Sequence, residues 1–192
     1  MVMSRSNEST VLENAIMSDL LSPEDNPSGY FFAVSGTAVC AALLLPLTMV
    51  IRPDINGGQR CWLSIGTWLF RIGLFLSIAI AMTTPFQESY IPSHVNMAFM
   101  AFAAMAAGLA VILIAAAYLS RTLRLTSALL GSLHALALIF LAYMFSIPNY
   151  FEGRRWVLGL CEWLLAAVIA IGTIAAVRGA AEKPNPASEG TA

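Results

Sequence analysis

Five long apolar stretches constrain this chain more than any other feature of its sequence. A helix needs roughly 20 mostly apolar residues to cross a bilayer, and five windows of about that length or longer follow one another along the chain. They cover residues 30–51, 62–82, 94–119, 123–147 and 156–178. Because short linkers rich in charge or turn formers separate them, the sequence predicts five helices packed as one antiparallel bundle.

The composition of the chain supports a membrane fold. Of the 192 residues, 58% are hydrophobic and 11% are charged, whereas soluble domains carry about 25% charged residues. Backbone polar groups must be satisfied inside a bilayer, and the sequence lacks the ten-residue alternating strands of a membrane barrel. We therefore predict an all-α, polytopic membrane helix bundle with five transmembrane helices.

The distribution of Lys and Arg predicts how the bundle is oriented. One side of the membrane receives six of them and the other receives three, so the positive-inside rule places the N-terminus outside and the C-terminus inside. The six are Arg52, Arg60, Arg121, Arg124, Arg178 and Lys183, and the three are Arg5, Arg154 and Arg155. The chain then divides into a polar acidic outer segment (1–29), a transmembrane domain (30–178) and an inner tail (179–192), which we expect to be disordered.

Several classes of partner and cofactor have little support. The net charge is −1 and no basic patch is contiguous, so we expect no nucleic-acid binding. Cys40, Cys61 and Cys161 are widely spaced in or beside apolar runs, which is typical of small core residues rather than of a zinc site. His94 and His134 are separated in depth by something like 15 Å, too far apart to ligate one haem iron or another single metal ion. We expect no cofactor and no metal.

Three ionisable residues inside the spans are candidates for function, because such groups are costly in a bilayer. Arg71 lies roughly 14 Å from the inner edge, and His134 lies roughly 16 Å from the same edge in a parallel helix. Glu162 lies about 9 Å below the outer edge of the last span. A snorkelling Arg71 reaches toward Glu162, so the sequence predicts an ion pair between them.

Two interpretations of these groups stay open. In the first, Arg71, Glu162 and His134 form an internal polar latch that fixes the register of the helices. In the second, they line an outward-opening pocket that holds a lipid headgroup or a reacting bond. An enzyme would need a nucleophile or a base, and the only assembly with that chemistry is His94 with Asp19 or Glu162. We therefore lean against catalysis.

Small residues spaced four apart let helices approach closely. They serve packing inside one bundle, or they form faces that bind a second copy of the chain or another membrane protein. Examples are Gly36/Cys40, Ala104/Gly108 and Ser127/Gly131.

The order of several short motifs resembles a known family. The motifs are an Ile-x-Ser-Asp-Leu segment followed by Pro and an aromatic-led span (Ile16 to Phe32), Phe86 with Pro-Ser-His94, Ser132-Leu-His134, and Trp156 with Gly159 and Glu162. Together they resemble the six-span family that includes the damage-regulated autophagy modulators, the Golgi factor that remodels GPI-anchor lipids, and bacterial relatives of unknown function. The resemblance covers most of residues 14–178.

The resemblance implies a function class and a site. The chain lacks the family's first span, so residues 14–29 correspond to the family's first outer loop. The family pattern implies an outward-facing polar cluster of Ser18, Asp19, His94 and Glu162, and members act in lipid remodelling, lipid-kinase scaffolding or autophagy control. We therefore expect a multi-pass integral membrane protein that handles membrane lipids or regulates the membrane through an outer-side polar pocket of Asp19, His94, Glu162, Arg71 and His134. The alternative is a structural or accessory subunit that packs against partner membrane proteins.

Overall fold

The computed structural model describes residues 28–50, 58–83, 91–119, 124–147 and 155–181. These ranges form five helices and contain no strand: α2 (Tyr30–Val50), α3 (Gly58–Thr83), α4 (Ile91–Leu119), α5 (Arg124–Ser146) and α6 (Arg155–Ala181). Each helix includes a stretch that is long and apolar enough to cross a membrane. The predicted five-span, all-α bundle is confirmed, while its orientation in the membrane stays a prediction.

The outer boundaries of the predicted domains are only partly described. Residues 1–27 and 182–192 fall outside the described ranges, so the acidic N-terminal segment stays a prediction. The predicted tail begins at residue 179, but α6 continues to Ala181. The helix therefore includes the first three residues of that tail.

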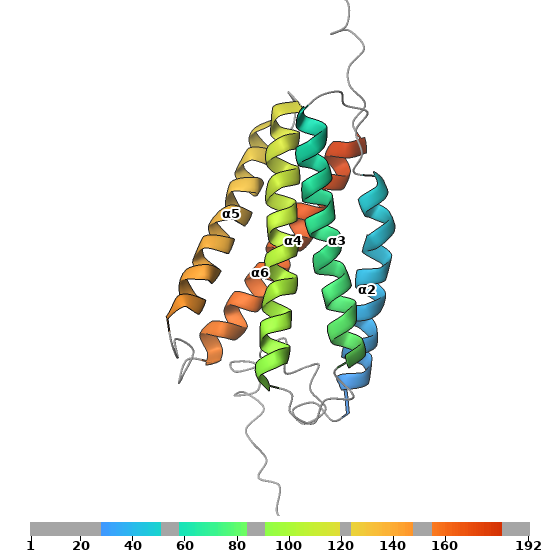
Figure 1. Cartoon of the computed structure of the whole chain (residues 1–192), viewed down its shortest axis with the longest axis vertical. Helices are drawn as coiled ribbons and strands as arrows, with labels where there is room; N and C mark the ends of the chain where they lie inside the picture. Colours follow the sequence, from blue (N-terminus) through green and yellow to red (C-terminus); the bar gives the residue numbers. More distant parts are fainter. Residues whose placement is uncertain (1–27, 51–57, 84–90, 120–123, 148–154, 182–192) are drawn as a thin grey trace, which may run out of the picture.

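The helices alternate in direction, and Figure 1 shows them side by side along one long axis. α2, α4 and α6 end where α3 and α5 begin. Arg60, Arg124 and Arg178 lie in the helix turns at that end, so we call it the arginine end. The opposite end holds the last turns of α3 and α5 and the first turns of α2, α4 and α6.

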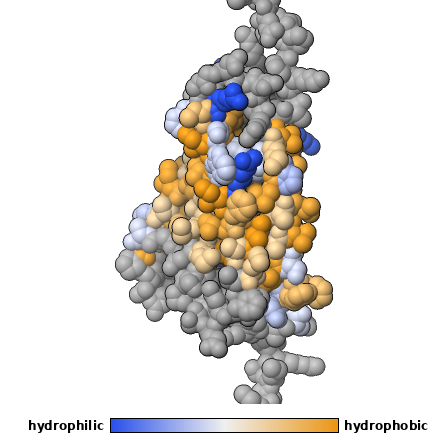
Figure 2. Space-filling model, turned by 45° about the vertical axis from the view of Figure 1, so that its right-hand side comes forward, coloured by the Kyte–Doolittle hydropathy of each residue, from blue (hydrophilic) through white to orange (hydrophobic). Residues whose placement is uncertain are grey.

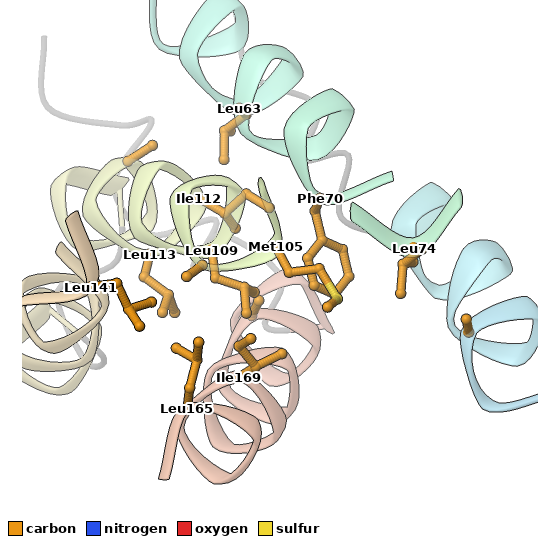
Figure 3. Close-up of a cluster of buried hydrophobic side chains, with 14 residues drawn as sticks. Leu63, Phe70, Leu74, Met105, Leu109, Ile112, Leu113, Leu141, Leu165 and Ile169 are labelled. Carbon is orange, nitrogen blue, oxygen red and sulfur yellow. The ribbon is translucent and has the colours of Figure 1, made fainter. Parts of the chain in front are cut away.

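α4 is the centre of the bundle. It contacts α3, α5 and α6, whereas α2 packs chiefly on α3 at one edge. Figure 3 shows the core around α4, where apolar side chains from three other helices converge on it. The labelled members are Leu63, Phe70 and Leu74 from α3, Met105, Leu109, Ile112 and Leu113 from α4, Leu141 from α5, and Leu165 and Ile169 from α6.

Two glycines bring the backbones of α3 and α4 together. A β-carbon on Gly108 would lie 2.5 Å from the backbone nitrogen of Phe70 and 2.6 Å from the carbonyl oxygen of Gly66. A β-carbon on Gly66 would lie 2.9 Å from the carbonyl oxygen of Gly108. Real β-carbons do not approach other atoms so closely, so this contact requires glycine on both helices.

The other small-residue pairs divide between the inside and the outside of the bundle. A β-carbon on Gly131 of α5 would lie 2.8 Å from the side chain of Ile114 on α4, so Gly131 also serves internal packing. Gly36 on α2 is different, because nothing lies within 4 Å of the position of its β-carbon. Gly36 and Cys40 are both exposed.

The outward surface of the bundle is apolar. Phe32 of α2 is 76% exposed and Leu125 of α5 is 72% exposed, and Figure 2 shows hydrophobic residues over most of the coloured part of the face that it presents. A soluble monomer rarely exposes apolar patches larger than a few hundred Å². Such a surface is suited to contact with lipid acyl chains.

We expect Gly108→Leu to lower the stability of the bundle by about 1–3 kcal/mol or more, the usual cost of overpacking a filled interface. Thermal unfolding of the purified protein in detergent measures the change. Gly36→Leu is the matched control, because its side chain meets open space, and it should leave the unfolding temperature nearly unchanged. Equal effects of the two substitutions would contradict the close contact between α3 and α4.

Candidate functional site

Arg71 lies midway along the candidate span Arg60–Met82 of α3. Its Nε donates a hydrogen bond of 2.7 Å to the hydroxyl oxygen of Thr48 on α2. A guanidinium carries five N–H donors in a planar fork, and this bond uses one of them. The Arg71 side chain is half buried, so part of it is accessible from outside the bundle.

The hydroxyl oxygen of Thr48 is available to accept this bond. Its hydroxyl donates to the carbonyl oxygen of Leu45 in its own helix, at 2.6 Å, which leaves the oxygen lone pairs for Arg71. The Thr48 side chain is fully buried, with 0% exposure. The hydrogen bond therefore joins α3 to a buried hydroxyl oxygen of α2.

Trp68 fixes the direction in which the Arg71 side chain extends. The guanidinium carbon lies 5.2 Å from the centre of the Trp68 ring, within the range of a cation–π interaction. Trp68 precedes Arg71 by one helical turn, and helical side chains lean toward the N-terminus of their helix. Arg71 therefore extends toward the start of α3, which is the arginine end. We call Arg71, Thr48 and Trp68 the Arg71 site.

The Arg71 site lies near the last turn of α2. Thr48 is two residues from the end of that helix at Val50, whereas α3 continues from Arg71 to Gly58 at the arginine end. Along this part of α3, Cys61, Ser64 and Trp68 recur every three to four residues and are exposed. Figure 2 shows hydrophilic residues reaching into the upper half of the hydrophobic face. This face of α3 leads from the Arg71 site to the arginine end.

His134 lies on a different helix interface. It is fully buried, with 0% exposure, and its Nδ1–H donates to the carbonyl oxygen of Leu130 at 2.7 Å. A β-carbon on Gly172 of α6 would lie 2.5 Å from Cε1 of the ring and 3.4 Å from Leu109 of α4. His134 is thus enclosed among α4, α5 and α6.

The described contacts do not join the predicted pocket residues into one group. Arg71 contacts α2, whereas His134 contacts α4 and α6, so these two groups lie at separate interfaces. Glu162 is half-buried near the start of α6, at the end opposite to the one toward which Arg71 extends. The structure thus gives Arg71 a partner, Thr48, other than the predicted Glu162.

The remaining pocket residues fall on undescribed parts of the chain. Asp19 lies in residues 1–27, outside the described ranges. His94 belongs to the first turn of α4, at the same end of the bundle as Glu162, but its side chain is also outside them. An outer-side cluster of Asp19, His94 and Glu162 stays a prediction.

Sequence reasoning did not find Thr48, Gly172 or the contact between Trp68 and Arg71. Thr48 carried only a weak signal, a hydroxyl residue near the end of an apolar run. Gly172 carried a better one, because a glycine in the last span permits close approach of a side chain from another helix. Neither signal identifies its partner, since the partner depends on how each helix is rotated.

Comparisons with known proteins identify no relative. No protein-family model matches the chain, and neither the curated proteins nor the solved structures include a significant match. Among the described residues, no three His, Cys, Asp or Glu side chains cluster as a metal ion would require.

We expect a double-mutant cycle of Arg71→Gln and Thr48→Val to give a coupling of about 1 kcal/mol, because an interhelical hydrogen bond to a charged group contributes on that order. Thermal unfolding in detergent measures each variant. Arg71→Gln combined with Glu162→Gln should be additive, as should Arg71→Gln with Thr37→Val, since the Thr37 hydroxyl bonds within its own helix. Strong coupling to Glu162 would instead support the predicted latch.

Proposed function

We propose that this integral membrane protein binds an anionic membrane lipid at the Arg71 site, with the guanidinium contacting the lipid phosphate. The observation that carries the proposal is a half-buried arginine in the middle of a membrane span whose bond to Thr48 uses one of its five donors. Lipid handling was the function expected from the sequence. The Arg71 site gives that expectation a specific residue and a specific chemistry.

The cost of an arginine in a bilayer supports an anionic ligand. A charged side chain at this depth is unfavourable unless it reaches the interface or finds a polar partner. The buried Thr48 hydroxyl is neutral and satisfies one N–H. A phosphate matches the planar fork of a guanidinium with two parallel hydrogen bonds, so a lipid phosphate satisfies both the charge and the geometry.

The charge of the arginine end favours the same ligand. Arg60, Arg124 and Arg178 are exposed at that end, and each basic residue near a membrane surface contributes about 1 kcal/mol of attraction to anionic lipids. Under the predicted orientation, this end faces the cytoplasmic leaflet, where anionic lipids are abundant. The exposed face of α3 at Ser64 and Trp68 offers a route from that surface to Arg71.

The Arg71 site is tested by native mass spectrometry of protein released from vesicles of phosphatidylglycerol and phosphatidylcholine. We expect wild-type protein to retain phosphatidylglycerol and Arg71→Gln to retain about tenfold less, since losing a charge-assisted contact of about 1.4 kcal/mol changes an affinity tenfold. Arg71→Lys should give an intermediate value, because lysine keeps the charge and loses the fork.

Arg124→Gln provides the control for this experiment. It removes the same charge from an exposed position at the same end of the bundle but outside the Arg71 site, and we expect a smaller loss of lipid than in Arg71→Gln. A soluble source of the phosphate is tested by adding inorganic phosphate, which should not displace the lipid. If Arg71→Gln and Arg124→Gln lose lipid equally, the arginine end attracts lipids without a site at Arg71.

A second candidate function is that of an accessory subunit, and one observation favours it. Gly36 and Cys40 are four residues apart and exposed on α2, with open space at the β-carbon of Gly36. α2 is also the helix at the edge of the bundle, with only Ala41 and Thr48 buried. A helix of a partner membrane protein can approach closely along such a face. The alternative face of Ala104 and Gly108 is unsuitable, because Gly108 already packs on α3.

The accessory role predicts that Gly36→Leu abolishes association while leaving the isolated bundle stable. Chemical cross-linking in native membranes, followed by mass spectrometry, measures which proteins are joined to the chain. Ser132→Leu on the exposed face of α5 is the control and should preserve any association. If cross-links persist in Gly36→Leu, the α2 face is not an interface.

A further inference from the structure

The depth of the Arg71 guanidinium limits which lipids can bind it. Arg71 lies eleven residues from either end of the candidate span Arg60–Met82, which is about 16 Å along the helix. Its guanidinium lies over the ring of Trp68, one turn nearer to the arginine end. A lipid phosphate that contacts it therefore lies below the ordinary headgroup level, and any group attached to that phosphate is drawn toward the hydrocarbon region with it.

The bond to Thr48 leaves one edge of the guanidinium for a ligand. Nε donates to the Thr48 hydroxyl, so the four N–H groups on the two terminal nitrogens take no part in that bond. Two parallel bonds from the terminal nitrogens match two oxygens of one phosphate. Of the other two oxygens on that phosphate, one carries the acyl chains through glycerol, and in most phospholipids the other carries a headgroup.

The described surroundings of Arg71 offer little to such a headgroup. The described parts of α2 and α3 contain no Asp, Glu or Lys, so these two helices give no carboxylate to an ammonium group. Ile72 and Phe75 are 47% and 55% exposed. Ser64 has the one exposed hydroxyl among the described side chains of α3, about 10 Å along the helix from Arg71. Because buried polar groups without hydrogen-bond partners are unfavourable, each polar group beyond the phosphate weakens binding.

We propose that the Arg71 site selects an anionic lipid that has no polar group beyond its phosphate, of which phosphatidic acid is the natural example. This selectivity rests on the lipid binding proposed above and adds the headgroup class to it. Phosphatidic acid brings negative charge to the guanidinium and no other polar group that must leave water. Phosphatidylglycerol brings the same phosphate together with headgroup hydroxyls, and phosphatidylserine brings an ammonium group and a carboxylate.

Native mass spectrometry of protein released from vesicles separates the effect of the headgroup from that of charge. The vesicles contain phosphatidylcholine with equal amounts of phosphatidic acid, phosphatidylmethanol and phosphatidylglycerol, all with the same acyl chains. Phosphatidylmethanol is the decisive probe, because it has the charge of phosphatidylglycerol but only a methyl group beyond the phosphate. We expect wild-type protein to retain phosphatidic acid and phosphatidylmethanol about tenfold more than phosphatidylglycerol, which corresponds to about 1.4 kcal/mol.

Two variants locate the preference. Arg71→Gln should remove it, because no guanidinium then holds the phosphate at this depth. Arg124→Gln is the matched control and should keep the ratio of the three lipids, since it lies outside the Arg71 site. Glycerol 3-phosphate, a soluble phosphate monoester, should not displace phosphatidic acid. Displacement would assign the site to a soluble ligand and overturn the proposal.

The remaining outcomes distinguish a failure of selectivity from a failure of lipid binding. Equal retention of the three lipids by wild-type protein, with loss of all three in Arg71→Gln, overturns the selectivity and leaves the lipid site in place. Retention of phosphatidylmethanol at the level of phosphatidylglycerol overturns it too, because the preference would then follow charge. A preference that persists in Arg71→Gln belongs to another part of the surface. Unchanged retention of all three lipids in Arg71→Gln contradicts the lipid site itself.

Discussion

The close contact of α3 and α4 is the constraint on which the rest of the bundle depends. Lipid tails are as apolar as leucine, so burying apolar side chains against each other gains little in a membrane, and helices associate through close packing and polar contacts instead. Gly66 and Gly108 let the two backbones meet with no side chain between them. α5 and α6 then pack on the other sides of α4. α2 remains at the edge, where the Arg71–Thr48 bond and apolar contacts with α3 hold it.

The five helices could be predicted because the length of an apolar run is a sufficient signal for a membrane span. The contacts between them could not, and the reason is physical. A helix that is apolar on all sides carries no hydrophobic stripe to tell which face is turned inward. Gly36 and Gly108 illustrate the consequence. Both belong to a small residue pair with the same spacing, yet Gly108 lies in the close contact between α3 and α4 and Gly36 meets open space.

The predicted partner of Arg71 differs from the described one because the prediction used the depth of each residue in the membrane and not the direction in which its side chain extends. Arg71 and Glu162 were compared by their distance along the membrane normal, which allows a long side chain to reach either way. A helical side chain leans toward the N-terminus of its own helix. α3 begins at the arginine end, so Arg71 extends over Trp68 and away from the start of α6. Because α3 and α6 are antiparallel, Arg71 extends away from the end of the bundle where Glu162 lies.

Arg71 and His134 differ in how far each is enclosed by the bundle, and this difference determines which of them is open to a lipid. Among the described residues, Arg71 brings five donors to one acceptor, the Thr48 hydroxyl, so it lacks acceptors and negative charge. His134 donates its Nδ1–H to the Leu130 carbonyl, and its buried Nε2 has no hydrogen-bond partner in the described part of the chain. The half-buried guanidinium is open to a molecule as large as a lipid. The enclosed imidazole is not, since Gly172 and Leu109 lie close around it. An anion therefore complements Arg71, because the hydrocarbon core of a bilayer supplies no acceptor for its free N–H groups.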